Sequence, residues 1–457
     1  MKRFIGDRQF YKYVFMLVIP VIIQQGITSF VNLLDNIMVG ALGTEAISSV
    51  SIANQIIFIS QLAVFGGLSA ISIYSAQFYG KGDMEGMRYS FRAKVIFSVV
   101  ISVITIVLLI FCGDFFMGLF LKGESSAGDP AVTADLAHQY LMVVLVGTIP
   151  FSVSQAYAGT LRETGQTVVP MAASVTGIFT NLCFNWLLIY GHLGFPKWGV
   201  YGAAVATTIS RFVEIVILVV YMHRRTKRYP FVTGIYRSLY IPGSFAAKVF
   251  RTGLPLFMNE FLWSFGMTVI NQSYSTYGLG VVAATSIAST TWNLFMIVMM
   301  GMGSAVQIIV GQHLGMGQIK EAREIDTKLT FLTFTMNTAL GLILIACSGY
   351  IPRLFNVDQT VRDLAAMLLV IDGLCLPIES LVHVTYFTIR SGGKTFITFL
   401  FDSVYSWVVP VPLAFFLSRY SALDIVTVFA VVQFSSIVKM IIGLFMLRSG
   451  FWAKKIV

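Results

Sequence analysis

Apolar runs of 20 or more residues recur from one end of this 457-residue chain to the other. A helix of about 20 apolar residues crosses the ~30 Å hydrocarbon core of a bilayer, so each run is long enough to span a membrane. Only 11% of the residues are charged, whereas a soluble globular domain has about 25%. The sequence therefore predicts an all-α polytopic membrane protein.

The apolar runs predict twelve transmembrane helices. The second and eighth runs are longer than a bilayer requires, so we expect these helices to tilt or to extend beyond the membrane. The predicted spans cover residues 14–39, 46–79, 94–112, 138–160, 168–190, 200–222, 249–275, 280–312, 329–350, 364–389, 396–417 and 424–447.

The formal net charge of +10 is distributed unevenly between alternate loops. With a cytoplasmic N-terminus, the inner segments hold 24 of the 31 Lys and Arg residues, and the outer loops hold Lys122, Lys197, Arg353, Arg362 and Arg419. Cytoplasmic loops of membrane proteins carry an excess of Lys and Arg. We therefore expect a multi-pass protein of the inner (plasma) membrane with both termini in the cytoplasm. The excess of positive charge reflects insertion into the bilayer and does not indicate a nucleic-acid partner.

Catalytic and nucleotide-binding motifs are missing from the sequence. The stretch "GKGDMEG" (80–86) is rich in glycine, but no strand precedes it and no Lys-Ser/Thr pair follows, as a phosphate-binding loop requires. We expect a tight turn there. The sequence also has no Cys/His metal cluster and no Ser–His–acid set. We expect no enzyme and no cofactor, and a pump without an ATP-binding domain would have to use an ion gradient.

An internal repeat relates the two halves of the chain. "SAQFYGKGDMEGMR" (75–88) and "IVGQHLGMGQIKEAR" (309–323) share Gln, Gly, Gly and Arg at a constant offset of 235 residues. Further along, "LRETGQT" (161–167) matches "IRSGGKT" (389–395) at an offset of 228. A collinear series of this kind indicates a duplication in which one loop of the second copy is shorter by seven residues.

The duplication predicts two pseudo-symmetric six-helix lobes. Because each lobe crosses the membrane an even number of times, both enter from the same side, which gives a parallel repeat with the substrate site between the lobes, as in many secondary transporters. We expect an N-lobe over 1–222, a cytoplasmic linker over 223–248 and a C-lobe over 249–457. The alternative is a duplication retained only for packing, but the acidic residues are placed unequally in the two copies.

Asp35 is the only formally charged residue between Lys12 and Glu45. A carboxylate at the centre of a membrane costs about 3 kcal/mol on insertion scales and usually faces the bundle interior or a water-filled cavity. We interpret Asp35 as an ion or proton site; the alternative is a capping or snorkelling acid near the outer interface. The second copy has Ile270 at this position, so the fold alone does not require an acid. Pro20 lies where it could kink the same helix.

The fifth and sixth spans supply polar partners for Asp35. Asn181 and Asn185 are separated by four residues and share one helical face, and Thr207 follows in the next span. Their oxygens could hold sodium, or their amides could hydrogen-bond a protonated acid. An Asn pair alone is more often a contact between helices.

The second half has its own acidic residues within apolar spans. They are Glu260, Asp372, Glu379 and, as a weaker candidate, Asp402. His383 follows Glu379 by four residues, so the two can share a helical face, and a carboxylate–imidazole pair can relay or store a proton. The alternative for His383 is a packing role.

The order of the motifs resembles that of the multidrug and toxic compound extrusion (MATE) transporters. The motifs are "DNIMVGALG" at the end of the first span, "AQFYGKGD" after the second, and "LRETGQT" and "IRSGGKT" after the fourth and tenth. The resemblance extends over nearly the whole chain and implies two six-helix lobes and antiport of organic compounds against protons or sodium.

The resemblance also implies roles for individual residues. Asp35 would be the N-lobe coupling residue of a prokaryotic member and a possible sodium ligand, with Asn181, Asn185 and Thr207 as its polar partners. Ion binding there would be linked to bending of the first helix at Pro20. Glu260 and Glu379 match C-lobe acid positions of NorM-like members, whereas DinF-like members often have an acid where this sequence has Asn185. The chain thus combines features of both branches.

We therefore expect a monomeric secondary antiporter that exports cationic or amphiphilic compounds by alternating access in the bilayer. The alternative within the same superfamily is a flippase for lipid-linked precursors, which would favour a strongly cationic cavity. Here the basic residues within the spans are essentially Arg211 and Lys439, and Arg211 lies three residues from Glu214, which could neutralise it. A channel or receptor would not need duplicated lobes with buried acids.

Overall fold

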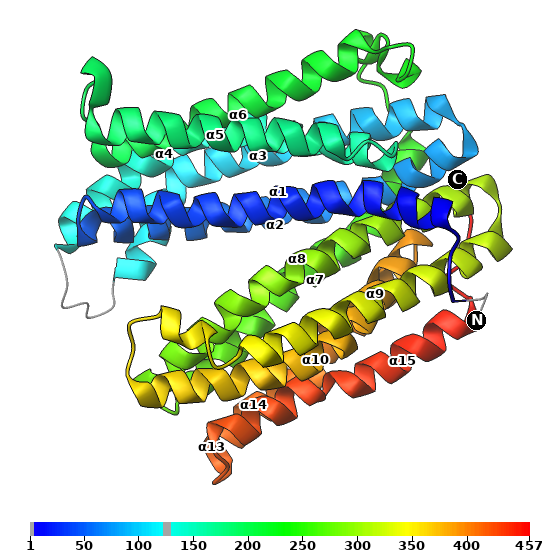
Figure 1. Cartoon of the computed structure of the whole chain (residues 1–457). Coiled ribbons are helices and arrows are strands. Elements are labelled where there is room, and N and C mark those ends of the chain that lie inside the picture. Colours follow the sequence, from blue (N-terminus) through cyan, green and yellow to red (C-terminus); the bar gives the residue numbers. More distant parts are fainter. Residues whose placement is uncertain (1–3, 122–128) are drawn as a thin grey trace. The chain divides into compact units, whose positions relative to one another are not determined.

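A computed structural model describes residues 4–121 and 129–457 of the chain. Lys122, one of the cations assigned above to an outer loop, lies outside the described residues, as do Lys2 and Arg3 at the N-terminus. Within the described ranges all regular structure is helical and no strand is present (Figure 1). The predicted all-α fold class is confirmed.

A helical segment occupies every predicted span. The first six helices are α1 (Arg8–Gly40), α2 (Thr44–Lys81), α3 (Met84–Leu121), α4 (Pro130–Glu163), α5 (Val168–Tyr190) and α6 (Gly199–Arg224). The next four are α7 (Gly243–Ser275), α8 (Leu279–Met316), α9 (Ile319–Cys347) and α10 (Gln359–Ser391). Short 3-10 turns are η1 (His192–Gly194), η2 (Pro230–Val232), η3 (Ile235–Arg237) and η4 (Ile351–Leu354).

The last two predicted spans are interrupted, which the apolar pattern did not indicate. The eleventh consists of α11 (Thr395–Phe399), the π-helical turn η5 (Leu400–Val404), α12 (Tyr405–Val408) and α13 (Pro410–Tyr420). The twelfth consists of α14 (Ile425–Phe434) and α15 (Ser436–Ser449). Pro410 lacks a backbone N–H and cannot continue the hydrogen-bond ladder of α12. Single π-turns inside helices often occur at functional sites.

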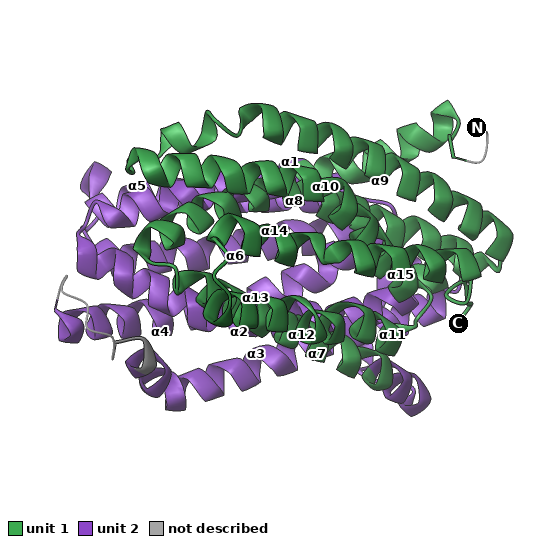
Figure 2. Cartoon of the chain, turned by 90° about the horizontal axis from the view of Figure 1, so that it is seen from below, with its two compact units in different colours: residues 1–22, 76–82, 250–457 green, residues 23–75, 83–249 purple. Residues whose placement is uncertain are grey.

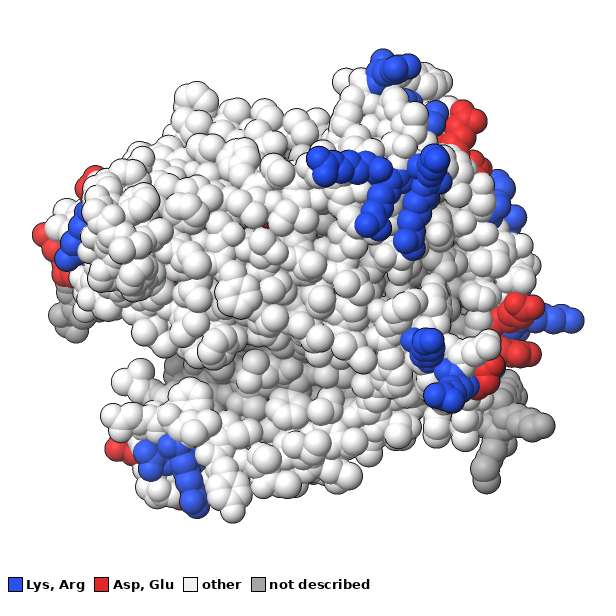
Figure 3. Space-filling view, turned by 45° about the horizontal axis from the view of Figure 1, so that its top comes forward, with Lys and Arg blue, Asp and Glu red and all other residues white. Residues whose placement is uncertain are grey.

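Most of the helices satisfy the requirements of a membrane span. Among the described residues, 11 helical segments are long and apolar enough to cross a bilayer. The exception among the predicted spans is α7, which has 33 residues but carries Lys248, Arg251 and Glu260. The predicted count of twelve therefore depends on α7. On the face drawn in Figure 3, charged side chains lie toward the ends of the helices and uncharged ones cover their middle parts.

The turns of the two repeats have the same backbone geometry. After α2, Gly82 N donates to Tyr79 O at 3.0 Å, and after α8, Gly317 N donates to Leu314 O at 3.0 Å. Both glycines have positive φ, +77° and +80°, a conformation that glycine adopts without steric cost. The predicted tight turn at "GKGDMEG" is confirmed, and the repeat extends from sequence to hydrogen bonding.

The matching turns after α4 and α10 also correspond. Gly165 N donates to Arg162 O at 2.9 Å, and Gly393 N donates to Arg390 O at 2.9 Å. Their φ angles are +80° and +75°. Here too the αL glycine ends a helix, as is common at helix C-termini.

The chain divides into two compact units (Figure 2). Unit 1 consists of Met1–Ile22, Ala76–Gly82 and Phe250–Val457, and unit 2 consists of Ile23–Ser75 and Asp83–Val249. The change of unit within α1 falls two residues after Pro20, which lies inside the continuous helix. The lobe boundaries expected from the sequence and the bending role of Pro20 stay predictions.

Candidate functional site

In unit 2, a polar cluster surrounds the carboxylate of Asp35 on α1. Asn185 Nδ2, from α5, donates to Asp35 Oδ1 at 2.8 Å and to Asn181 Oδ1 at 3.2 Å. Asn181 Nδ2 in turn donates to Thr207 Oγ1 on α6 at 3.2 Å. The α5 spacing of four residues places both amides on one face. The structure thus brings together the four N-lobe residues selected from the sequence.

The Asn181 amide lies against the Asp35 carboxylate, and the protonation state of Asp35 decides which of the two amide atoms faces that carboxylate. In the orientation just described, Asn181 directs an oxygen toward Asp35, and a carboxylate is an acceptor unless it is protonated. With the amide reversed, Asn181 Nδ2 donates to Asp35 Oδ2 at 2.9 Å, and its oxygen accepts from Thr207 Oγ1 at 3.2 Å. The first arrangement therefore suits a protonated Asp35, and the second suits an ionised one.

Asp35 is half-buried, and its direct hydrogen-bond partner is an amide. Among the described residues, none forms an ion pair with Asp35. The charge of Arg211 acts on Asp35, but Arg211 forms its ion pair with Glu214 on its own helix at 3.5 Å and lies over the Phe151 ring at 4.8 Å. Asn185 Oδ1 is buried and has no hydrogen-bond partner. The cluster thus has a carboxylate and a free carbonyl oxygen available for a small cation.

Tyr140 and Asn54 also belong to this cluster, and the sequence reasoning missed both. Tyr140, on α4, donates its hydroxyl to Asn54 Oδ1 on α2 at 3.5 Å and lies against Thr207. Tyr140 is buried, with an exposed fraction of 5%. Neither residue has a spacing that relates it to Asp35, so only the folded helices reveal the contact.

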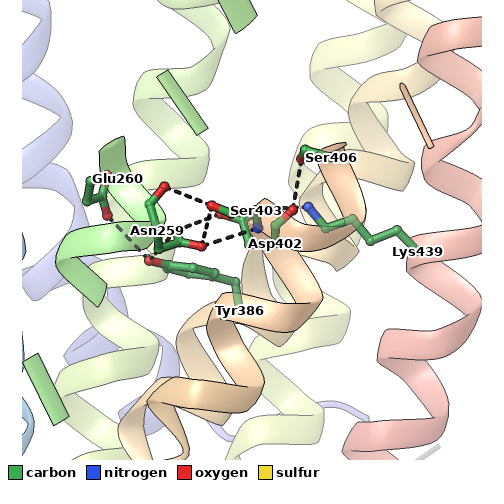
Figure 4. Close-up of polar contacts among 7 residues, drawn as sticks. All are labelled: Asn259, Glu260, Tyr386, Asp402, Ser403, Ser406 and Lys439. Carbon is green, nitrogen blue, oxygen red and sulfur yellow. Dashed lines mark hydrogen bonds and ion pairs between the residues drawn. The ribbon is translucent and has the colours of Figure 1, made fainter. Parts of the chain in front are cut away.

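In unit 1, a second polar network centres on Asp402 in η5 (Figure 4). Lys439 Nζ on α15 donates to Asp402 Oδ1 at 2.7 Å, and Asn259 Nδ2 on α7 donates to Asp402 Oδ2 at 2.9 Å. The adjacent Glu260 accepts from the Tyr386 hydroxyl at 3.4 Å. Asp402, the weaker candidate from the sequence, is therefore the centre of the network, and Glu260 lies at its edge.

The other C-lobe candidates occupy different surroundings on α10. Glu379 is half-buried and lies within range of the charges of Lys439 and Asp402. His383 contacts the rings of Tyr386 and Phe387, with centroid distances of 6.5 and 5.7 Å. No hydrogen bond joins His383 to Glu379 within the described part of the chain, so the proton relay between them stays a prediction.

Asp372 lies farther along α10, away from the Asp402 network. Its Oδ1 accepts from Gln433 Nε2 on α14 at 2.7 Å, and its exposed fraction is 2%. Gln433 lies two residues before Ser435, where α14 gives way to α15. The structure thus places Asp372 beside a helix interruption.

Two further buried polar contacts, one in each unit, were not selected by the sequence reasoning, and each includes a threonine from the same position of the repeat. In unit 2, Lys94 Nζ donates to Glu163 Oε2 at 2.6 Å and to Thr160 Oγ1 at 3.3 Å. In unit 1, Thr388 donates to the buried Asp326. Thr160 and Thr388 differ by the repeat offset of 228, which is the signal that could have drawn attention to both.

The fold and its buried carboxylates define the class: a polytopic helical membrane protein made of two repeats. The MatE family model matches residues 20–187 and 255–416, and the two matched segments begin at the repeat-related prolines Pro20 and Pro255. The chain belongs to the MatE family. The resemblance predicted from the motifs is confirmed.

Proteins of known name align with almost the whole chain. The "Probable multidrug resistance protein NorM" of Thermotoga maritima is 23% identical over 453 residues, covering 98% of this chain and 94% of the relative. The "Probable multidrug resistance protein YoeA" of Bacillus subtilis is 25% identical over 418 residues, covering 90% and 88%. A crystal structure of MATE in complex with MaL6 has a TM-score of 0.85 at 22% identity and covers 98% and 97%. The structural likeness confirms the fold.

Proposed function

We propose that the protein exports cationic or amphiphilic compounds across the membrane in exchange for a cation that binds at Asp35. Support for export of such compounds comes from family membership and from relatives named for multidrug resistance. Support for coupling comes from the N-lobe cluster. The observation that carries the proposal is an intramembrane carboxylate with amide partners and no cation of its own.

The coupling ion that best suits this cluster is the proton. Asp35 and Asn181 approach within 2.9 Å, a distance at which two oxygens share a proton or an amide donates to a carboxylate. A proton on Asp35 would be shared with the Asn181 oxygen, which also accepts from Asn185 Nδ2. Sodium is the alternative, with Asn185 Oδ1 as an additional oxygen ligand.

Export then follows because the proton and the organic cation favour different conformations of the protein. A proton from outside neutralises Asp35 and lowers the affinity of the protein for an organic cation. Release of that proton inside restores a negative charge that attracts the next substrate. A ligand shifts such an equilibrium only by its differential affinity for the two states, so the charge of Asp35 has to change between them.

Replacement of the carboxylate tests the role of Asp35. Asp35→Asn keeps the size of the side chain but cannot lose a proton, so we expect gradient-driven ethidium efflux from proteoliposomes to fall to the level of protein-free vesicles. The control is Asp114→Asn, the same change at an exposed acid on α3, which should retain the wild-type rate. Wild-type efflux by correctly inserted Asp35→Asn would refute the proposed role.

A further inference from the structure

The Lys439 ammonium lies in a box with one acidic and two aromatic walls. Asp402 Oδ1 accepts its hydrogen bond at 2.7 Å. The ring centroids of Phe401 and Tyr405 lie 5.4 and 5.7 Å from Nζ. The side chains of Lys439 and Asp402 are only 10% and 18% exposed. A carboxylate with aromatic faces is the arrangement that proteins use to bind organic ammonium ions.

Two of the three walls of this ammonium box, Asp402 and Tyr405, are held by further hydrogen bonds. Asn259 donates to the second oxygen of Asp402 at 2.9 Å, and Ser403 Oγ donates to Asn259 Oδ1 at 2.8 Å (Figure 4). The Tyr405 hydroxyl donates at 2.7 Å to the carbonyl oxygen of Ser435, at the interruption between α14 and α15. The interrupted helices thus orient the ring and the carboxylate. Asp402 and Tyr405 therefore have hydrogen-bond partners besides the lysine that fills the box.

A lysine in this place requires an explanation. A charged side chain within a transmembrane helix is costly, and such residues mark functional sites by default. The repeat-related residue in unit 2, Arg211, pairs with Glu214 on its own helix. Lys439 instead reaches from α15 to an acid on another helix. The duplication therefore does not account for the contact.

We propose that the box formed by Asp402, Phe401 and Tyr405 is an alkylammonium-binding site and that Lys439 is its internal occupant. An external primary ammonium would make the same hydrogen bond to Asp402 Oδ1 and the same contacts with the two rings. Lys439 excludes it by tethering an ammonium at high effective concentration. The residue therefore determines whether this part of unit 1 accepts a cation.

Together with the proposed function, on which this step rests, the occupied box restricts where the coupling ion is exchanged. The acid at the centre of the unit 1 network already has a fixed cation, whereas Asp35 has amide partners only. Exchange of the coupling ion would then take place at Asp35. The existence of the box does not depend on that conclusion, because it can be tested without transport.

Chemical rescue of a shortened side chain tests the proposal. Lys439→Ala removes the ammonium and its stem, and thermal unfolding of the full-length protein in detergent is then followed during titration with n-butylammonium chloride. We expect a saturable rise in the unfolding temperature, because a ligand that binds only the folded state stabilises it by mass action. Potassium chloride and n-butanol at the same concentrations should give no such rise.

Two comparisons decide the result. Wild-type protein, whose box is filled, and the double variant Lys439→Ala/Asp402→Asn, whose box lacks its acid, should show no saturable rise. Absence of a rise in Lys439→Ala, or an equal rise in all three proteins, would overturn the proposal. If Lys439→Ala is not recovered in folded form, Lys439→Met keeps the stem, and methylammonium chloride replaces n-butylammonium with the same expected and contradicting outcomes. Failure of Asp35→Asn to stop efflux would leave this thermal result unaffected and would refute only the proposed function.

Discussion

Lys94 and Glu163 illustrate what a fully buried charge requires in this chain. Their side chains are 1% and 5% exposed, and Lys94 Nζ lies 2.6 Å from both carboxylate oxygens of Glu163. Removal of two charges from water is expensive, and the penalty is offset only when the partners and the remaining hydrogen bonds are in place. Asp402 and Lys439 satisfy this requirement, whereas Asp35 has only amide donors. Among the described residues, Asp35 shares the lack of an ion pair with the buried Asp372 and Asp326, but it is the half-buried acid of the three and has two amides and a hydroxyl around it.

Removal of one partner of the Lys94–Glu163 pair should be strongly destabilising. Glu163→Gln leaves the Lys94 ammonium buried without a counter-charge, so we expect the free energy of unfolding to fall by about 3–5 kcal/mol. Chemical denaturation in detergent micelles measures the change. The matched control is Asp114→Asn at the exposed His138 pair, where a change of about 0–1 kcal/mol is expected. Equal stability of the Glu163→Gln and wild-type proteins would contradict this account.

At the scale of elements, the shared Gln-x-x-Gly motif marks the place where the ends of α2 and α8 touch within unit 1. A Cβ atom on Gly80 would collide with the backbone carbonyl of Gln312, and one on Gly315 would collide with that of Gln77. The contact is reciprocal because the motif occurs at the same place in both repeats. Glycine at these positions permits close approach of the two backbones.

An added methyl group at this crossing should separate the two helix ends. We expect Gly80→Ala to lower the free energy of unfolding by about 1–3 kcal/mol, the usual cost of an overpacked contact. Gly118→Ala in α3 is the matched control, because nothing lies within 4 Å of the Cβ position there. Unfolding curves that place Gly80→Ala at or above the stability of Gly118→Ala would show that the crossing tolerates the methyl group.

The segment after α15 packs into unit 1 through Trp452, which is 1% exposed and donates its Nε1–H to Leu447 O at 3.1 Å. Gln77 on α2 holds the same segment, because its Oε1 accepts from Ile456 N at 2.9 Å and its Nε2 donates to Ser391 O at 3.0 Å. The segment thus connects the end of α2 to the turn after α10. This contact belongs to the tertiary structure and has no counterpart in the apolar pattern.

Truncation of the Trp452 side chain should loosen this segment. We expect Trp452→Ala to cost about 3–5 kcal/mol, the range for loss of a large buried aromatic residue. Limited proteolysis of the purified protein should then cleave the segment from 450 to 457 faster than in wild type. The exposed Trp198 provides the control, since Trp198→Ala removes a ring that is 44% exposed. Unchanged cleavage in Trp452→Ala would mean that the backbone contacts with Gln77 are sufficient.

At the scale of the whole molecule, the duplicated chain carries two unlike polar clusters. In unit 2, the Asp35 carboxylate accepts from an amide and forms no ion pair among the described residues, whereas in unit 1 the Asp402 carboxylate is paired with the Lys439 ammonium. Arg211 and Lys439, the two cations selected from the spans, are each paired with an acid. Such pairing neutralises these two cations, as the proposed export of cationic compounds requires.

The coupling ion can be identified by imposing one gradient at a time. We expect ethidium efflux from proteoliposomes after a pH jump that supplies protons from the side opposite to ethidium release, because the Asp35 cluster suits a shared proton. A sodium jump at constant pH should drive no efflux. Efflux in sodium alone would instead identify sodium as the ion at Asp35 and Asn185. Vesicles containing Asp35→Asn serve as the control for passive leakage.

The sequence by itself determined that this is a polytopic helical membrane protein, where its spans lie and that its two halves are repeats. These properties depend on local composition and on matches at fixed offsets, and a span requires only enough consecutive apolar residues. The grouping of Asp35 with Asn181 and Asn185 was also predictable, because a lone acid needs polar partners and a four-residue spacing places two amides on one helical face.

Only the tertiary structure decided which acids have partners. Asp402 ranked below Glu260 and Glu379 in the sequence, yet it is the acid that Lys439 and Asn259 contact. These partners lie 37 and 143 residues away, and no spacing rule relates helices that meet only after folding. The interruptions near Asp402 and Ser435 were likewise absent from the apolar pattern, because π-turns and helix breaks depend on the contacts that compensate their lost hydrogen bonds. The apolar pattern specifies which segments enter the membrane, whereas packing between helices specifies which charges meet there.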